Sequence, residues 1–376
     1  MDGRGAARVR HDIVRLCHAG LDSRTLRVET LRHLRKQIAV DSFWFATADP
    51  ATLLFTGSVV EEIPERLTAR FVDNEFLQDD VNKWTQLARA AQPANGLYAA
   101  TQGRPDDSAR YREILAPLHL GDELRVAVRD GSSCWGFLCM HRELASPGFT
   151  PEEVTFVSRL APHLALGLRT ALLIDAAVTL PEPGGPGLVL LSDDLSVSAI
   201  TPVAERWLAE IADWPRRSEL PQAIYGIAAQ LRALERHGAA RPDQMPHGRI
   251  RTASGRWLML HGSRLSGPGA DGQTAVILEL ARPTAIAPLV LHAYNLTERE
   301  ADVSQLVLKG LSTGEIAADL LLTALTVQQH LKAVFDKTGV HSRRELTALI
   351  FAQQYLPRIQ SGSHVGTDGW FVSPKL

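Results

Sequence analysis

The 376-residue sequence is poor in several features that would place it in a special class of protein. Its three cysteines, Cys17, Cys134 and Cys139, are too few and odd in number for a disulfide framework, so we expect a reducing compartment. No run of about 18 apolar residues occurs, which argues against a transmembrane helix. The basic N-terminus is not followed by an apolar core, so no secretory signal is expected. These absences predict a cytoplasmic protein without membrane contact.

An excess of charge of one sign is also missing, because the formal net charge is −2. A protein that coats nucleic acid or an anionic membrane over its whole surface would need a larger charge. One localised contact surface remains compatible with this composition. Lysine is scarce: none lies between residues 84 and 308, and Lys309, Lys332 and Lys337 fall close together near the C-terminus.

Motifs for catalysis or cofactor binding are not found either. The sequence G-x-G-x-x-G at 267–272 is followed by the strand-like QTAVILEL, so it predicts a hairpin loop, since a dinucleotide site needs a helix there. The acidic pair Asp193–Asp194 lacks the later lysine that a phosphoacceptor domain needs. Cys134 and Cys139 have odd spacing and alternate across a strand, so they are not expected to share a metal. We therefore expect no catalytic residue, no metal and no cofactor.

Two stretches rich in proline or glycine divide the chain. LPEPGGPG (180–187) and ARPTAIAP (281–288) are predicted to be linkers. They define three domains and a flexible C-terminal tail: 1–178, 187–282, 289–356 and 357–376.

The first domain has the pattern of an α+β fold. Its predicted elements are helices over about 10–38, strands over 42–48 and 52–57, a hairpin over 123–143 and an exit helix over 150–177. Asp130–Gly131 is a hairpin turn signal. Thr150 and Glu153 form a predicted capping box at the start of the exit helix, and Pro162 should kink or split that helix.

The second domain is predicted to contain a small antiparallel sheet with helices on one face. The run that begins at 187 predicts two short strands and then a helix from about 202. RIRTASGRWLMLHGSRL (249–265) and GQTAVILELAR (272–282) predict further strands joined by glycine-containing turns.

The C-terminal segment carries the strongest signals. Hydroxyl caps predict four helix starts: Thr297, Ser312, Thr323 and Ser342. Gly310 and Gly339 lie where helix ends favour a left-handed residue. The expected helices cover about 297–308, 312–321, 324–338 and 342–353. The turn between the second and third is so short that the two helices must cross steeply, as in a helix-turn-helix.

The third of these helices has two different faces. Val327, Leu331 and Val334 point to one side, where they can pack in a core. The opposite side carries four residues suited to base edges: Leu325, Gln328, Gln329 and Lys332. Glutamine amides donate and accept hydrogen bonds together and suit adenine, lysine suits guanine or a phosphate, and leucine suits a thymine methyl group. The alternative is a solvated helix surface without a partner.

Residues 296–352 resemble the LuxR-type helix-turn-helix domain. The matching elements are LTERE (296–300), the Leu306/Gly310 pair, EIA (315–317), TVQQH (326–330) and KTGVHSRREL (337–346). The resemblance implies that double-stranded DNA is the partner and that Gln328, Gln329 and Lys332 face the bases. It implies backbone contacts from three residues: Thr326, Lys337 and Arg343. It implies a homodimer that pairs through the fourth helix by four residues: Leu346, Ala348, Leu349 and Ala352.

The segment departs from this family in its charge. The position after Val327 is usually basic in the family, and here it is Gln328. Charges over 289–356 also nearly cancel. We therefore expect modest non-specific affinity and a shallow salt dependence, since each missing phosphate contact removes about 0.9 from the salt slope.

Two weaker resemblances concern the other domains. Residues 10–175 resemble a GAF domain through WGFLCMHRE (135–143) and FTPEEVTFVSRLAPHLALGL (149–168). Residues 187–282 resemble a PAS domain. A GAF fold implies a pocket between sheet and helices, and four aromatic residues are candidates to line it: Trp44, Trp84, Tyr98 and Tyr111. For each of them, an ordinary core or surface position is the alternative.

Together these observations predict a multidomain protein. Two α+β sensory domains, GAF-like and PAS-like, precede an all-α four-helix helix-turn-helix domain that binds DNA. The predicted function is sequence-specific transcription regulation, modulated by a small molecule or a partner sensed in the N-terminal domains, and not enzymatic. The alternatives are a sensor that turns over a small molecule and a ligand-free protein-interaction regulator.

Overall fold

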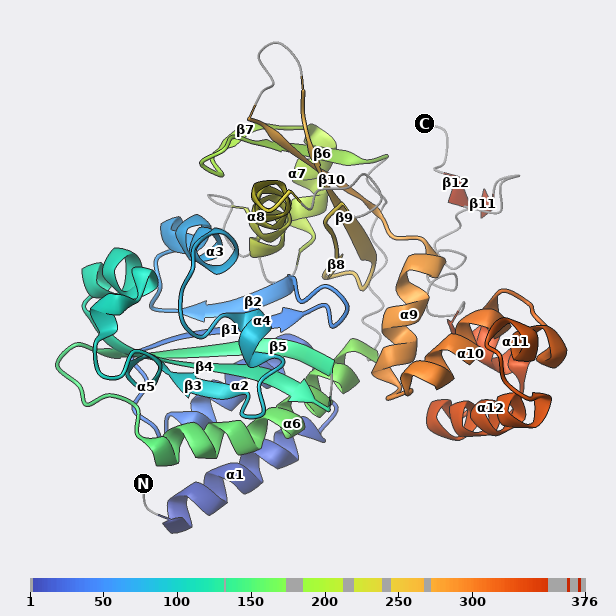
Figure 1. Ribbon diagram of the computed structural model, residues 1–376, viewed down its shortest axis with the longest axis horizontal. Helices are drawn as coiled ribbons and strands as arrows, with labels where there is room; N and C mark the ends of the chain where they lie inside the picture. Colours follow the sequence, from blue (N-terminus) through green and yellow to red (C-terminus); the bar gives the residue numbers. More distant parts are fainter. Residues whose placement is uncertain are drawn as a thin grey trace. The chain divides into compact units, whose positions relative to one another are not determined.

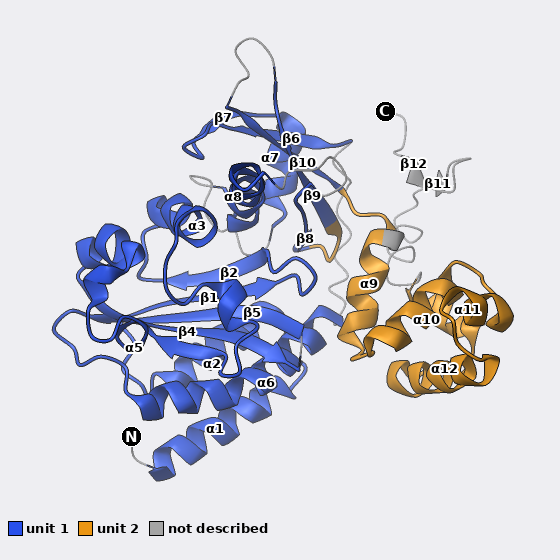
Figure 2. Ribbon diagram, viewed as in Figure 1, with its two compact units in different colours: residues 1–174, 185–253, 258–279 blue, residues 175–184, 254–257, 280–376 orange. Residues whose placement is uncertain are grey.

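The computed structural model divides the chain into two compact units (Figure 1). The residues that it describes are 3–131, 133–173, 185–211, 220–238, 245–266, 272–350, 364–365 and 371–372. Figure 2 shows unit 1, which comprises 1–174, 185–253 and 258–279, and unit 2, which comprises 175–184, 254–257 and 280–376. Within the described ranges, no helix has the length and apolar character needed to cross a membrane.

The N-terminal part of unit 1 is built on a five-stranded sheet. Its strands are β1 (Ser42–Ala48), β2 (Phe55–Glu61), β3 (Ala94–Gly96), β4 (Leu120–Asp130) and β5 (Ser133–Glu143). Their spatial order is β2-β1-β5-β4-β3, and the paired strands are antiparallel. The predicted α+β character and the hairpin at Asp130–Gly131 are confirmed.

Helices cover both faces of this sheet. The helices α1 (Gly3–Cys17), α2 (Ser23–Leu34) and α6 (Pro151–Leu173) pack together on one side, below the sheet in Figure 1. The connection from β2 to β4 contains α3 (Thr68–Leu77), α4 (Trp84–Leu87), α5 (Leu97–Ala100) and short turns at Glu65–Leu67, Pro105–Asp107, Tyr111–Leu115 and Ala116–Leu118. The core between the layers is apolar, with Phe43, Phe45 and Phe137 fully buried.

The second predicted strand was placed too early, at 52–57. The carboxylate of Asp49 accepts a hydrogen bond from the backbone N–H of Ala51. The backbone C=O of Asp49 accepts from the N–H of Leu53, and its backbone N–H donates to the C=O of Leu54, so the chain makes a turn here. Leu53 takes a left-handed backbone conformation with φ of 59°. Strand β2 therefore begins only at Phe55. The run TLLF (52–55) is mostly apolar, but its first residues belong to the turn and not to the strand.

The exit helix begins as predicted and is not split. Thr150 and Glu153 exchange the two hydrogen bonds of a capping box at the start of α6. Pro162 lies inside this helix, which continues to Leu173 as one element. A proline removes one hydrogen bond from the ladder, and the buried face on both sides of Pro162 holds the helix together. The predicted end at 177 and the linker residues up to 184 lie outside the described residues.

The second part of unit 1 has its own five-stranded sheet. The elements are β6 (Gly187–Leu191), β7 (Val197–Ile200), α7 (Pro202–Ala209), α8 (Gln222–Arg236), β8 (His247–Arg251), β9 (Trp257–Arg264) and β10 (Thr274–Leu280). Their strand order is β7-β6-β10-β9-β8, the same relative order as in the first sheet. The G-x-G-x-x-G sequence joins the neighbouring strands β9 and β10, and 267–271 lie outside the described residues.

The predicted linker at 281–288 contains the start of a helix, because α9 (Pro283–Ala293) begins at Pro283. Proline is favoured in the first turn of a helix, where its missing N–H would have no partner in any case. Pro288 lies deeper in the helix and removes one hydrogen bond. The apolar residues compensate, since Ile286, Leu289 and Leu291 are buried. Composition alone suggested a linker, but the buried apolar residues form a helix here.

The rest of unit 2 contains α10 (Glu298–Leu308), α11 (Thr313–Asp319) and α12 (Ala324–Thr338), and 343–350 are also helical. Thr297 and Ser312 form the predicted capping boxes, and Thr323 caps α12 by its hydroxyl alone. Gly339 ends α12 with φ of 71°. In the predicted tail, the described residues form the short ladder β11 (His364–Val365) with β12 (Phe371–Val372).

Candidate nucleic-acid interface and buried pocket

The helix α12 is anchored through one face. Val327 and Val334 are fully buried and Leu331 is 5% exposed, as the helical spacing predicted. The helix α12 contacts α11, whose Ile316 is also fully buried. A single turn joins α11 and α12, so the second helix is held firmly against the first (Figure 1).

The opposite face of α12 is open. Gln328, Gln329 and Lys332 are exposed, and Leu325 is 66% exposed. Within the described part of the chain, none of these four side chains makes a hydrogen bond or an ion pair. The helix therefore presents two free amides, a cation and an apolar side chain on one surface.

Sequence reasoning missed Leu321, which lies in the turn before α12. Its side chain is 92% exposed, and its φ of 54° places it in the left-handed region. A leucine takes this conformation at a cost of about 1–2 kcal/mol, so the surrounding turn must impose it. Only the run Leu320–Leu321–Leu322 signalled the residue, and the run did not tell which leucine faces out.

The three residues predicted to contact the DNA backbone all have partners inside their own domain. Lys337 Nζ donates to Glu300 Oε2 at 2.6 Å. Arg343 donates to the carbonyl oxygen of Leu311 at 2.8 Å and to Thr313 Oγ1 at 2.7 Å. The hydroxyls of Thr326 and Thr323 lie 2.8 Å apart. The bonds of Lys337 and Arg343 connect different segments of the domain, whereas the contact between Thr323 and Thr326 is local to the start of α12.

The pKa of Glu300 reflects its ion pair with Lys337. Burial raises the pKa of this carboxyl, and the bonds from Lys337 and from the backbone N–H of Thr297 outweigh burial, so the pKa lies below its usual value. The ion pair therefore joins the start of α10 to the end of α12.

The four residues predicted to form a dimer surface differ in position. Leu346 is fully buried inside its own domain, so it has no surface to offer a partner. Ala348 is exposed and Leu349 is half-buried. Ala352 lies outside the described residues.

Unit 1 contains a mostly apolar pocket of about 580 Å³, a volume that includes the open solvent at its mouth. Of the four predicted aromatic residues, Trp44 and Trp84 line it, and their rings are stacked with centroids 5.6 Å apart. Tyr98 and Tyr111 do not line it. Tyr98 is 37% exposed, and Tyr111 is buried in a separate apolar cluster that includes Leu97, Leu115 and Leu120.

A network of buried charges lies at the polar side of this pocket. Arg125 pairs with Glu75 at 2.8 Å and with Glu123 at 3.2 Å, and its guanidinium lies 4.3 Å from the centre of the Trp84 ring. Arg110, which is fully buried, pairs with the same Glu123 at 2.7 Å and with Asp80 at 3.8 Å. Burial raises the pKa of Glu123, but the two guanidiniums outweigh burial and hold that pKa well below its usual range.

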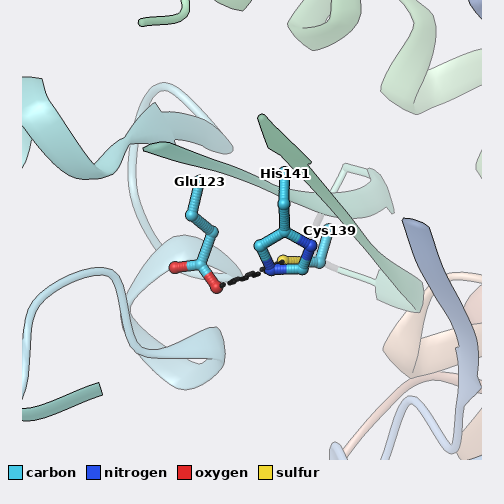
Figure 3. Close-up of side chains that lie close together, drawn as sticks. All are labelled: Glu123, Cys139 and His141. Carbon is cyan, nitrogen blue, oxygen red and sulfur yellow. Dashed lines mark hydrogen bonds and ion pairs between the residues drawn. The ribbon is translucent and has the colours of Figure 1, made fainter. Parts of the chain in front are cut away.

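Glu123, Cys139 and His141 form a compact cluster beside this network, as Figure 3 shows. The other oxygen of Glu123 lies 3.3 Å from Cys139 Sγ and 3.4 Å from His141 Nε2. His141 Nδ1 lies 2.8 Å from the hydroxyl of Ser42, which orients the ring. Burial, followed by the carboxylate of Glu123, raises the pKa of the Cys139 thiol well above its usual value.

The three ligand atoms of this cluster lie within 4.8 Å of one another, a spacing that a metal ion could use. Arg110 and Arg125 argue against that use, because both guanidiniums contact Glu123 and would repel a divalent cation. The arrangement therefore fits a hydrogen-bonded cluster better than a metal centre.

Sequence reasoning missed this cluster because it paired the two cysteines with each other. Cys139 and His141 are two residues apart and share a face of β5. Glu123 is the direct antiparallel partner of His141 across the hairpin. The register of the predicted hairpin would have brought the three side chains together.

The two sheets of unit 1 are joined by polar contacts near the pocket. Gln222, at the start of α8, lines the pocket and accepts a hydrogen bond from Trp44 Nε1 at 2.9 Å. Asp49, after β1, accepts two hydrogen bonds from Arg249 of β8, at 2.6 and 2.7 Å. Both members of this second pair are buried. One side chain that lines the pocket, that of Gln222, therefore comes from α8, which follows the first strands of the second sheet.

Two family models match parts of the chain. Residues 294–350 match the model described as bacterial regulatory proteins, luxR family, and residues 28–168 match the GAF domain. The chain therefore carries a LuxR-family regulatory domain near its C-terminus and a GAF domain near its N-terminus. The resemblances to the LuxR-type domain and to the GAF domain are confirmed, and the resemblance of 187–282 to a PAS domain stays a prediction.

The sequence similarity to an individual curated protein covers only a small part of the chain. The nitrate/nitrite response regulator protein homolog of Haemophilus influenzae is 41% identical over 59 residues, which is 16% of this chain and 28% of that protein. The match thus spans well under a third of that relative's length.

Solved structures give low similarity scores. A phage VqmA–DPO complex is 18% identical, with 46% of this chain and 86% of that chain covered and a TM-score of 0.19. Escherichia coli SdiA is 12% identical, with 92% and 96% covered and a TM-score of 0.31. Scores this low do not establish a common fold.

Proposed function

We propose that this protein is a sequence-specific DNA-binding transcription regulator, whose DNA binding is modulated by a small molecule or partner sensed in unit 1. The observation that carries the proposal is the two-faced helix α12 inside a LuxR-family domain. One face is locked into the core, and the other offers amides and a cation that have no partner in the described part of the domain.

In this proposal the residues of α12 have separate roles. Gln328 and Gln329 read base edges, because an amide can donate to and accept from adenine at once. Lys332 contacts guanine or a phosphate. Leu325 and the neighbouring Leu321 supply exposed apolar contacts for thymine methyl groups. Thr326, Lys337 and Arg343 act on the DNA backbone, and their bonds within the domain hold them in place.

We further propose that the protein acts as a cytoplasmic homodimer on inverted half-sites spaced about one helical turn apart. The helix over 343–350 supplies the pairing surface through Ala348 and Leu349. The domain between the GAF domain and α9 is PAS-like in this proposal. Its support is the strand order, which repeats the order of the GAF sheet.

The proposed modulation is a shift between populated conformations. A molecule in the GAF pocket contacts Gln222 of α8 directly, so binding changes the fit between the two sheets of unit 1. The Asp49–Arg249 pair fixes the same boundary at a second point. The change would reach unit 2 along the chain that follows β10.

The test is a binding experiment on full-length protein. A preferred duplex is first selected from a random library, and binding to it and to a scrambled duplex is compared. Gln328→Ala should cost about 1–3 kcal/mol on the selected duplex and much less on the scrambled one. Gln305→Ala, which removes an amide from α10 instead, is the matched control and should leave both affinities unchanged. An equal loss on the two duplexes for Gln328→Ala would show that the residue does not read bases.

A further inference from the structure

The GAF pocket has walls that suit an apolar molecule. Trp44, Phe55, Phe71 and Trp84 line it together with aliphatic residues: Val60, Ile63, Pro64 and Val72. Trp44 is 8% exposed and Trp84 is 4% exposed, so little water reaches these rings. Pockets of this type take up small molecules through apolar contact and fix their orientation with a few polar groups.

The charges beside the pocket are already balanced within the protein. Three carboxylates, those of Glu75, Asp80 and Glu123, face three cationic side chains: Arg110, Arg125 and Lys83. Lys83 Nζ donates to the carbonyl oxygen of Glu75 at 2.7 Å, and Asn74 provides a second backbone acceptor. A charged ligand would therefore enter without a free counter-ion, and an unpaired buried charge is costly.

Both oxygens of Glu75, the carboxylate that lines the pocket, are already engaged within the protein. One oxygen of Glu75 accepts from the backbone N–H of Trp84 at 2.8 Å, and the other accepts from Arg125 at 2.8 Å. The carboxylate of Glu123 is equally occupied, by the two arginines on one oxygen and by Cys139 and His141 on the other. An ammonium group would have to share acceptors that Arg125 and the backbone N–H of Trp84 already use, and the charge of Glu75 is already offset by Arg125.

A hydrogen-bond donor that lines the pocket, in contrast, remains unused. Arg125 is 3% exposed, and its fully buried Nε lies 3.2 Å from Glu123 in an ion pair, so this nitrogen is not open to a ligand. Gln222 accepts from Trp44 through its carbonyl oxygen. The amide nitrogen of Gln222 has no partner among the residues that the structure describes. Both side chains line the pocket.

We infer that the GAF pocket binds an uncharged, mostly apolar small molecule that carries a hydrogen-bond acceptor, such as a carbonyl oxygen or a ring nitrogen. The acceptor meets the free amide N–H of Gln222, and the rest of the molecule fills the aromatic part of the cavity. This inference rests on the proposed sensory function, and it adds the chemical class of the effector.

Three probes of the same shape and different charge test the inference on the full-length protein. The probes are 2-naphthamide, 2-naphthoate and 2-naphthylmethylammonium, and affinities come from titration calorimetry at neutral pH. The neutral amide should bind at least about tenfold more tightly than either ion, because each ion loses its hydration without gaining a counter-ion. Equal or tighter binding of either ion, or no binding of any probe, would overturn the inference.

A variant that changes the charge of a lining residue tests whether the probes bind in this pocket. Glu75→Gln removes one negative charge from Arg125 and keeps an acceptor for Trp84. It should raise the affinity for 2-naphthoate about tenfold and leave 2-naphthamide nearly unchanged. Glu205→Gln, an exposed position on α7, is the control and should change neither. An unchanged naphthoate affinity in a folded Glu75→Gln protein would contradict the charge balance described above.

A second variant does not touch the charges. Gln222→Ala removes an amide donor and should weaken 2-naphthamide about fivefold, with no loss for 2-naphthylmethylammonium. The probe ranking is independent of DNA. If the ranking holds while 2-naphthamide leaves the affinity for the selected duplex unchanged, the pocket chemistry stands and the proposed modulation fails.

Discussion

The two sheets of unit 1 share a strand order but differ in what they bury. The GAF sheet places Glu123, Arg125 and His141 on its strands, all at most 3% exposed. The second sheet buries mainly aliphatic side chains, among them Val189, Leu191, Leu258, Leu260, Val276 and Leu278. Topology therefore does not decide where a polar site forms. Side chains at particular register positions decide it, and only the GAF sheet combines them with a cavity among the described residues.

The largest expected effect comes from breaking the charge network. Glu123→Gln leaves Arg110 and Arg125 buried with less negative charge, so the free energy of unfolding should fall by about 3–5 kcal/mol. The matched change in the second sheet is Glu279→Gln on β10, whose side chain is half exposed beside His261. It should change stability by less than about 0.5 kcal/mol. Urea unfolding of both variants provides the measurement, and similar losses would refute the contrast between the sheets.

Acid should weaken the GAF sheet through the same residue. The pKa of Glu123 is held well below its usual range in the folded protein, while the unfolded chain has an ordinary value of about 4.3. The stabilisation is therefore complete above that ordinary value and is lost as the pH falls below it. Unfolding followed between neutral pH and about pH 3 should show a steeper loss for the natural protein than for Glu123→Gln. If the free energy of unfolding depended on pH in the same way in both proteins, Glu123 would not be charged in the folded protein.

A smaller effect is expected at the boundary between the sheets. Arg249→Lys keeps the charge opposite Asp49 but cannot reproduce the two parallel hydrogen bonds. It should cost about 1.5–3 kcal/mol and separate the unfolding of the two domains. Calorimetric scans would reveal the second transition. A single transition at an unchanged temperature would mean that the pair does not link the domains.

Much of this architecture could be predicted from local signals in the sequence. The caps at Thr150, Thr297 and Ser312 and the turn at Asp130–Gly131 depend on neighbouring residues, and each formed as expected. The buried face of α12 followed from helical spacing. These features need no knowledge of distant contacts.

The failures involve contacts between distant residues. Composition predicted a linker at Pro283–Pro288, where burial produces a helix. Tyr98 and Tyr111 were expected at the pocket, but the chain between β2 and β4 carries them elsewhere. Gln222 reaches the pocket from 178 residues beyond its partner Trp44, and no local pattern announces such a contact.

The most direct measurement of the central claim is a photocrosslink between the full-length protein and a selected duplex that contains iodouracil. The account predicts crosslinked peptides from Ala324–Thr338, with contacts at Leu325, Gln328 or Gln329. Crosslinks confined to other helices, or no binding at low ionic strength, would contradict it.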